Sequence, residues 1–119
     1  MLFYKIEGTP MNHGAESEPT RHAQRVAARR IAVKSNEFNE KSRHGSYFFA
    51  VNVTDTIATI GVIAERRAEV DKTLPAYLNH IECELTDVVK TEITFSSMQH
   101  LLGVADRQGY ISDDDVMEK

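Results

Sequence analysis

The sequence is poor in the features that mark membrane, secreted and disulfide-rich proteins. Among its 119 residues there is one cysteine, Cys83, which excludes an intramolecular disulfide framework and is compatible with a reducing cytoplasm. No apolar run approaches the roughly 18–20 residues that cross a bilayer. The first five residues show no basic stretch followed by an apolar one, which a secretory signal requires. We therefore expect a cytoplasmic protein with no membrane partner.

Motifs of common enzyme and metal sites are also missing. There is no Gly-x-Ser-x-Gly elbow, no glycine-rich phosphate loop ending in Lys-Ser/Thr, and no Cys-x-x-Cys. His80 and Cys83 come nearest to ligand spacing, but one pair lacks the further ligands of a zinc site. Tyr4, His44 and Ser46 at one end of a sheet would suit metal-independent RNA cleavage, although no spacing specifies this. The sequence thus predicts no catalytic residue, no metal site and no cofactor in this chain.

What the composition contains is typical of a globular domain. Hydrophobic residues make up 41% of the chain and charged residues 27%, which excludes a disordered polymer. There are 14 Lys+Arg against 18 Asp+Glu, a formal net charge of −4. A chain of this length is expected to form one domain.

Hydrophobic periodicity predicts four strands and three helices. The expected strands are residues 2–8, 46–53, 57–64 and 87–95. The first helix is expected from Ser17 to about Lys41, with one side formed by Ala23, Ala27, Ile31 and Phe38. The second is expected to begin between Val70 and Leu74, with Pro75 in its first turn. The third is expected to run from a cap at Ser96 or Ser97 to about Arg107, with a stripe of Met98, Leu101, Leu102 and Ala105, and to end at Gly109.

The order β-α-β-β-α-β with an extra helix predicts an α+β fold of the ferredoxin-like type. This is a split sandwich in which a four-stranded antiparallel sheet has two helices on one face, here followed by a C-terminal helix. Right-handed crossovers place the first and third strands at the centre of the sheet. Gly61, inside the third strand, predicts a bulge or the close approach of a packed helix.

Alternation along the strands predicts two sheet faces of different character. The face toward the two helices is expected to carry Leu2, Tyr4, Ile6, Val89, Ile93 and Phe95. The opposite face is expected to carry Phe3, Phe48 and Ala50 among polar residues, and these three are the candidate interface residues. Because burial of a phenylalanine contributes roughly 1.5–3 kcal/mol, we expect something to cover part of that face. The candidates are the third helix, a second copy of the domain, or the rest of a longer chain.

Positive charge is concentrated in the first helix of this acidic chain. The candidates for binding nucleic acid or another anion are Arg21, Arg25, Arg29, Arg30 and Lys34. Such a row can follow a phosphate backbone and release counterions. The alternative is a solvated helix face paired with acids such as Glu18 and Glu37, which is the commoner role of charge runs on helices.

The last residues have the pattern of a helix start. Ser112 followed by Asp113, Asp114 and Asp115 provides a hydroxyl cap and negative charges for the helix macrodipole. The chain after Ser112 is too short for a stable isolated helix, which needs roughly 12 residues. We therefore expect residues 1–111 to form the domain, and residues 112–119 to begin a helix or linker to a downstream module. The alternative is a frayed acidic tail, and a reading frame beyond Lys119 would decide between the two.

Four segments together resemble the amino-terminal segment of some bacterial AAA-type ATPases. They are LFYKIEG at residues 2–8, SNEFNEK at 35–41, TIGVI at 59–63 and DRQGYISDDD at 106–115. The resemblance implies a bacterial cytoplasmic protein that would bind ATP and magnesium in a module after Lys119. For residues 1–119 it implies a non-catalytic interaction or regulatory domain that recognises a substrate or partner.

Architecture alone suggests an alternative, because ferredoxin-like domains recur in RNA-binding and RNA-processing proteins of CRISPR systems. The basic helix suits that function, whereas the net charge of −4 weakens it. The expected partners are thus a protein or the downstream domain of the same chain, a second copy in a homo-oligomer, and, in the alternative, nucleic acid.

Overall fold

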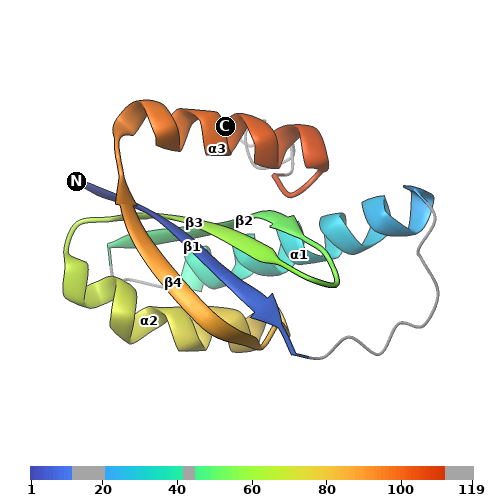
Figure 1. The fold of residues 1–119 in the computed structure, drawn as a ribbon, viewed down its shortest axis with the longest axis horizontal. Helices are drawn as coiled ribbons and strands as arrows, with labels where there is room; N and C mark the ends of the chain where they lie inside the picture. Colours follow the sequence, from blue (N-terminus) through green and yellow to red (C-terminus); the bar gives the residue numbers. More distant parts are fainter. Residues whose placement is uncertain (12–20, 42–44, 112–119) are drawn as a thin grey trace.

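The elements of the fold follow the predicted order. The computed structural model describes residues 1–11, 21–41 and 45–111, without the side chains of residues 21–24. Its elements are β1 (Leu2–Pro10), α1 (Arg21–Lys41), β2 (Ser46–Val53), β3 (Ala58–Ala64), α2 (Arg67–His80), β4 (Leu85–Ile93) and α3 (Phe95–Gln108) (Figure 1). Residues 12–20, with the expected cap Ser17, and residues 112–119 lie outside the described residues.

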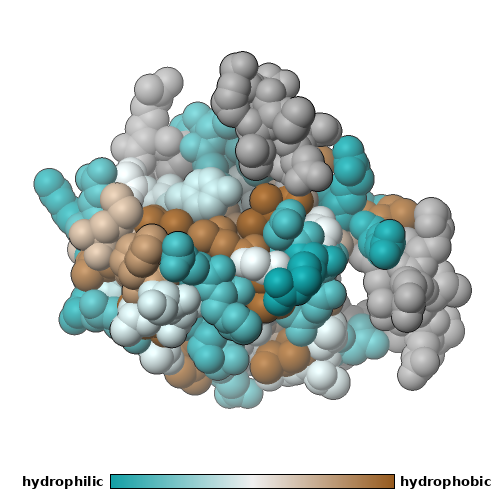
Figure 2. Space-filling view, turned by 90° about the horizontal axis from the view of Figure 1, so that it is seen from above, coloured by the Kyte–Doolittle hydropathy of each residue, from teal (hydrophilic) through white to brown (hydrophobic). Residues whose placement is uncertain are grey.

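The sheet confirms the ferredoxin-like α+β fold. Its strand order is β2-β3-β1-β4 and every neighbouring pair is antiparallel, so β1 and β3 are central. Helices α1 and α2 cover one face of the sheet and α3 covers part of the other (Figure 1). The extra helix therefore makes a third layer, and its side of the molecule, seen from above in Figure 2, carries a band of apolar residues among hydrophilic ones.

Aromatic side chains form the core between α1, α2 and the sheet. Phe48 stacks on Tyr77 with 4.9 Å between ring centroids, and Phe38 meets both rings edge-on. The Tyr77 hydroxyl is 2.6 Å from Ser35 Oγ, a buried hydrogen bond between α2 and α1. The stripe of α1 that faces the sheet includes the buried residues Ala28, Ala32 and Ser35, so the expectation for Ala27, which is exposed, was wrong.

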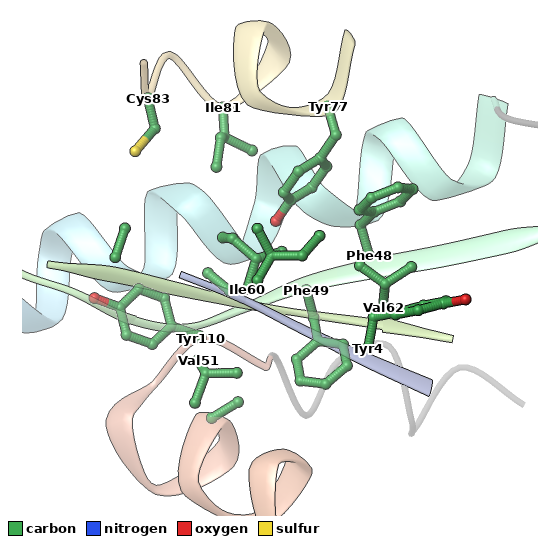
Figure 3. Close-up of a cluster of buried hydrophobic side chains, with 14 of the residues drawn as sticks. Tyr4, Phe48, Phe49, Val51, Ile60, Val62, Tyr77, Ile81, Cys83 and Tyr110 are labelled. Atoms are coloured by element: carbon green, nitrogen blue, oxygen red, sulfur yellow. The ribbon is translucent and has the colours of Figure 1, made fainter. Parts of the chain in front are cut away.

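A second part of the core lies between the sheet and α3, toward which the side chains of Phe49 and Val51 point (Figure 3). Met98 and Ala105 are buried along α3 as predicted, and Leu101 and Leu102 are half-buried. Phe49 of β2 points to this layer, and its ring lies over Gly61 of the neighbouring strand. The close approach predicted at Gly61 is therefore made by a cross-strand phenylalanine and not by a helix.

The predicted faces of β2 and β4 need correction. Phe48 and Ala50 pair with β3 on the α1/α2 face and are 0% exposed. The prediction failed there because residues 48–51 are all apolar and all buried, so no alternation fixes which residue points to which face.

The strand β4 keeps the predicted alternation of residues 89–93 but turns it to the other face of the sheet. Val89 and Ile93 pair with Glu7 and Phe3, which places them on the α3 face. Phe95 is not in the strand but begins α3. The sequence pattern does not show which face of β4 is inward, because most residues of the strand are exposed, whichever face they lie on.

Two helix starts also differ from the predictions. Helix α2 begins at Arg67 and not between residues 70 and 74, so Pro75 lies inside the helix, on its exposed side. Packing of its buried residues, Val70 and Tyr77 among them, outweighs the local cost of the proline. Helix α3 is capped by Thr94, whose hydroxyl accepts from Ser97 N at 3.1 Å. Its predicted end is confirmed, since Gly109 has φ 93 in the left-handed region.

Candidate interaction surface

The outer edge of β2 is closed by two side chains of the same chain. Asn39 Nδ2 donates to the Phe48 carbonyl at 2.8 Å, and Phe48 N donates to Asn39 Oδ1 at 3.0 Å. Near the other end of the strand, Val53 N donates to the Tyr110 hydroxyl at 3.0 Å, which in turn donates to the Val53 carbonyl at 3.3 Å. The amide of Asn39 and the phenol of Tyr110 thus occupy backbone N–H and C=O groups with which another strand would pair. Such contacts protect an edge from unwanted pairing.

The outer edge of β4, at the opposite side of the sheet, is different. Among the described residues, no strand pairs with this edge. The hydrogen bonds of its side chains in the same set are made with the interior of the fold: Thr86 donates to β1, Lys90 donates to α2, and Glu92 accepts from α2. The row of backbone groups on that edge therefore remains available for pairing, as on any free edge strand.

Apolar side chains are exposed beside this free edge. Val89 is 56% exposed and Phe95 is 59% exposed, and Ile93 between them is half-buried. The Phe95 ring lies 5.7 Å from that of Phe3, centroid to centroid. Because α3 runs from the end of β4 toward β2, it leaves β4 itself uncovered (Figure 1). We call the residues Val89, Thr91, Ile93 and Phe95 the β4 strip.

The other face of β4 carries fixed charges. Lys90 pairs with Asp71 of α2 and lies over the Tyr4 ring, 5.2 Å from its centroid. Arg67 Nη2 lies 3.1 Å from Glu92 Oε1, while Arg67 Nε donates to the Tyr4 hydroxyl at 3.1 Å. Exposed ion pairs add little stability. These pairs instead hold one positive and one negative side chain of β4 in defined positions along the free edge.

A cleft lies between the sheet and the first turns of α3. It has a volume of about 350 Å³ and is lined by Lys5, Ile93, Ser96, Ser97, His100 and Leu101. Lys5 Nζ lies 3.9 Å from Glu7 Oε2, so a neighbouring carboxylate already accompanies its charge. The cleft joins residues distant in sequence and carries no spacing signal, which is why sequence reasoning missed it.

The basic residues of α1 share one exposed surface. Arg25, Arg29 and Arg30 are exposed and Lys34 is half-buried, while the side chain of Arg21 lies outside the described part of the chain. Val26, 47% exposed, lies among them. No acidic residue occurs in the sequence from residue 21 to residue 36, so the positive charge is concentrated. The structure brings these predicted residues together on one exposed side of a single helix.

Of the candidate interface residues, only Phe3 lies near a surface. Its half-buried ring contacts the exposed Phe95. Phe48 and Ala50 are buried by the domain itself and offer nothing to a partner, which corrects their assignment to an interface. Sequence reasoning missed Val89 and Phe95 because it assigned both to the core.

Two titratable side chains of the core, Cys83 and Tyr77, are buried. Burial raises the pKa of the Cys83 thiol, and it raises the pKa of Tyr77 despite the hydrogen bond between Tyr77 and Ser35. His80 Nε2 lies 3.4 Å from Glu37 Oε1 without hydrogen-bond geometry, and the neighbouring ring of Phe38 is 5.8 Å away. Within residues 1–11, 21–41 and 45–111, no three His, Cys, Asp or Glu residues are grouped so that they could hold a metal ion.

The structure places two members of the trio considered for RNA cleavage, and its convergence at one end of the sheet stays untested. Tyr4 is buried and hydrogen-bonded to Arg67, and Ser46 lies at the start of β2. His44 falls outside the part of the chain that the structure describes.

Comparisons of the chain with protein-family models, with curated proteins and with solved structures find no match. The resemblance to AAA-type ATPases therefore rests on its sequence segments and stays a prediction. In the described part of the chain, no helix has both the length and the apolar character that crossing a membrane would require.

Proposed function

We propose that this domain is a non-catalytic protein-interaction module that binds an extended polypeptide segment along the free edge of β4. The observation that carries the proposal is the difference between the two edges of the sheet. The β2 edge is closed by Asn39 and Tyr110, whereas the β4 edge lies open beside exposed apolar side chains. Addition of a strand to such an edge gives affinity through main-chain hydrogen bonds, and specificity through alternate side chains.

Selection of peptides tests this proposal without knowledge of the natural partner. Peptides that bind the protein are selected from a random library, and their affinities are measured by calorimetry. We expect Val89→Lys to weaken binding by roughly tenfold or more, because a charge then faces the apolar side of the added strand. The matched control is Val26→Lys, which places the same charge on an exposed valine of α1.

Hydrogen exchange locates the bound peptide. We expect slower exchange of amides in residues 88–93 on binding, and unchanged exchange in α1. Equal binding by wild type and Val89→Lys, or protection confined to α1, would contradict the proposal.

A second candidate function, RNA binding, is favoured by one observation, the exposed Arg25, Arg29 and Arg30 on α1. Contacts from such a row to phosphates would make the affinity fall steeply with salt. The variant Arg25→Glu with Arg29→Glu should abolish binding of single-stranded RNA. Lys72→Glu with Arg107→Glu changes the net charge equally at exposed sites on α2 and α3 and should retain it. Binding that survives the first pair, or is lost equally with both, would remove α1 as an RNA site.

The larger context remains a prediction from the resemblance described above. In that prediction the domain regulates, or selects substrates for, an ATPase whose ATP and magnesium site lies after Lys119. A longer reading frame with a glycine-rich phosphate loop would support it. A stop codon after Lys119 would refute it and leave the interaction module as it stands.

A further inference from the structure

The partner of the β4 edge can be specified further, and this step rests on the proposed function. We propose that the segment bound there is β4 of a second copy of this chain, antiparallel and centred on Thr91. The two sheets would then join into one eight-stranded sheet across a twofold axis.

In antiparallel pairing about a twofold axis, two directly opposed residues lie on the same face of the joined sheet. The axis therefore passes through one residue position, and the residue at that position lies opposite its own copy. Centring on Lys90 or on Glu92 would oppose two like charges, which destabilises a strand pair. Centring on Val89 would run the pairing through Asp87, where β4 bulges: two β4 residues oppose Gly8, and Asp87 has φ 55. Among the centres from Val89 to Glu92, Thr91 is the one that avoids both faults.

The register centred on Thr91 is complementary on both faces. On the α2 face it sets Lys90 opposite Glu92 of the second copy, and Glu92 opposite Lys90 of the second copy. Because Asp71 already pairs with Lys90, and Arg67 with Glu92, the charges then alternate in sign across the junction. On the α3 face, Val89 meets Ile93 of the second copy, both from the β4 strip.

The apolar side chains near the junction extend this complementarity. Phe95 follows the paired segment directly and is 59% exposed, in contact with Phe3 of the same chain. Figure 2 shows apolar surface at the end of the molecule where β1 and α3 begin, next to the end of β4. A second copy seated along β4 lies beside that surface, and cross-strand pairs of apolar and of opposite-charge residues are what stabilises such a junction.

Sedimentation equilibrium of charge variants tests the register. Wild type should dimerise, and Lys90→Glu and Glu92→Lys should each weaken self-association by roughly tenfold or more, because each opposes like charges twice. An equimolar mixture of the two variants should dimerise again, since every cross-chain pair is then of opposite sign. Lys72→Glu, an exposed control on α2, should behave as wild type. A mixture that associates no better than its components would overturn the inference.

Cross-linking gives an independent readout that does not depend on charge. Thr91→Cys should form an intermolecular disulfide under mild oxidation, because the two copies of position 91 oppose each other across the axis. Thr86→Cys lies outside the paired segment and should not, and the native Cys83 is buried. A monomeric wild type that still binds selected peptides at β4 would overturn this inference alone. A wild type that neither dimerises nor binds selected peptides would overturn the proposed function too.

Discussion

Substitution of Gly61 by alanine tests the packing between the sheet and α3. A Cβ at Gly61 would lie 2.3 Å from Phe49 Cζ and 2.7 Å from both Cε atoms of the same ring. Carbon atoms that are not bonded to each other do not approach so closely, so the ring has to move. Phe49 is 1% exposed, however, and is held among buried neighbours. Gly61→Ala therefore forces a displacement inside a close-packed core.

The magnitude follows from two opposing effects. Overpacking of a core costs about 1–3 kcal/mol, while the loss of unfolded-state entropy from glycine to alanine returns about 0.4–1 kcal/mol. Because a contact of 2.3 Å places the overpacking cost in the upper half of its range, we expect Gly61→Ala to lower the free energy of unfolding by about 1–2.6 kcal/mol. This corresponds to a fall in Tm of roughly 4–20 °C for a domain of this size. Gly103→Ala is the matched control, because it adds the same methyl group at a site whose nearest atom is the mobile end of Arg107, at 3.5 Å.

Urea unfolding followed by circular dichroism measures both variants. Gly103→Ala should gain roughly 0.5–1 kcal/mol, since alanine favours a helix interior more than glycine does. Adding Phe49→Leu to Gly61→Ala should cost less than the sum of the two single changes, because the shorter side chain removes the clash. Equal stability of wild type and Gly61→Ala, or strict additivity with Phe49→Leu, would refute this account of the packing.

The remaining predictions concern the hydrogen bonds and buried groups of the core. Tyr77→Phe should cost about 1–3 kcal/mol in urea unfolding by leaving Ser35 buried without a partner, and Ser35→Ala in the same chain should recover part of that loss. Asn39→Ala should cost about 1–3 kcal/mol and speed amide exchange at Phe48; unchanged exchange would show that Asn39 does not close that edge. Burial raises the pKa of Tyr77 and Cys83 above their ordinary 10.0 and 9.0, so the unfolded chain loses protons first. Stability should therefore be complete below about pH 9 and fall as the pH rises further, as pH-dependent urea midpoints would show. Cys83 should react with a thiol reagent far more slowly in the folded than in the unfolded protein.

The arrangement of elements could be predicted from the sequence because it depends on signals repeated over many residues. Alternation in β1, the helical stripe of Met98 and Ala105, and the glycine at position 109 each agreed with the structure. Strand order followed from the handedness of crossovers. These features are redundant, so an error of a few residues at one helix start leaves the fold unchanged.

The faces of particular residues could not be predicted where the pattern is degenerate. Ala27 and Ala28 are of the same residue type, and only packing shows that the second is buried. In β4 an exposed valine looks the same in the sequence as a buried one. The residues that close the β2 edge, Asn39 and Tyr110, are single side chains whose partners lie 9 and 57 positions away, a relation that no local pattern contains.

The closed edge of β2 limits how large an assembly of this domain can become. A sheet that accepts strands at both edges can grow copy by copy into a fibre, whereas a sheet with one open edge stops growing once that edge is filled. In the proposed dimer the two outermost strands are both β2, each ended by the amide of Asn39 and the phenol of Tyr110. Two side chains at one border of the sheet would thus make the proposed dimer a terminal assembly, in which pairing through β4 would not lead to aggregation.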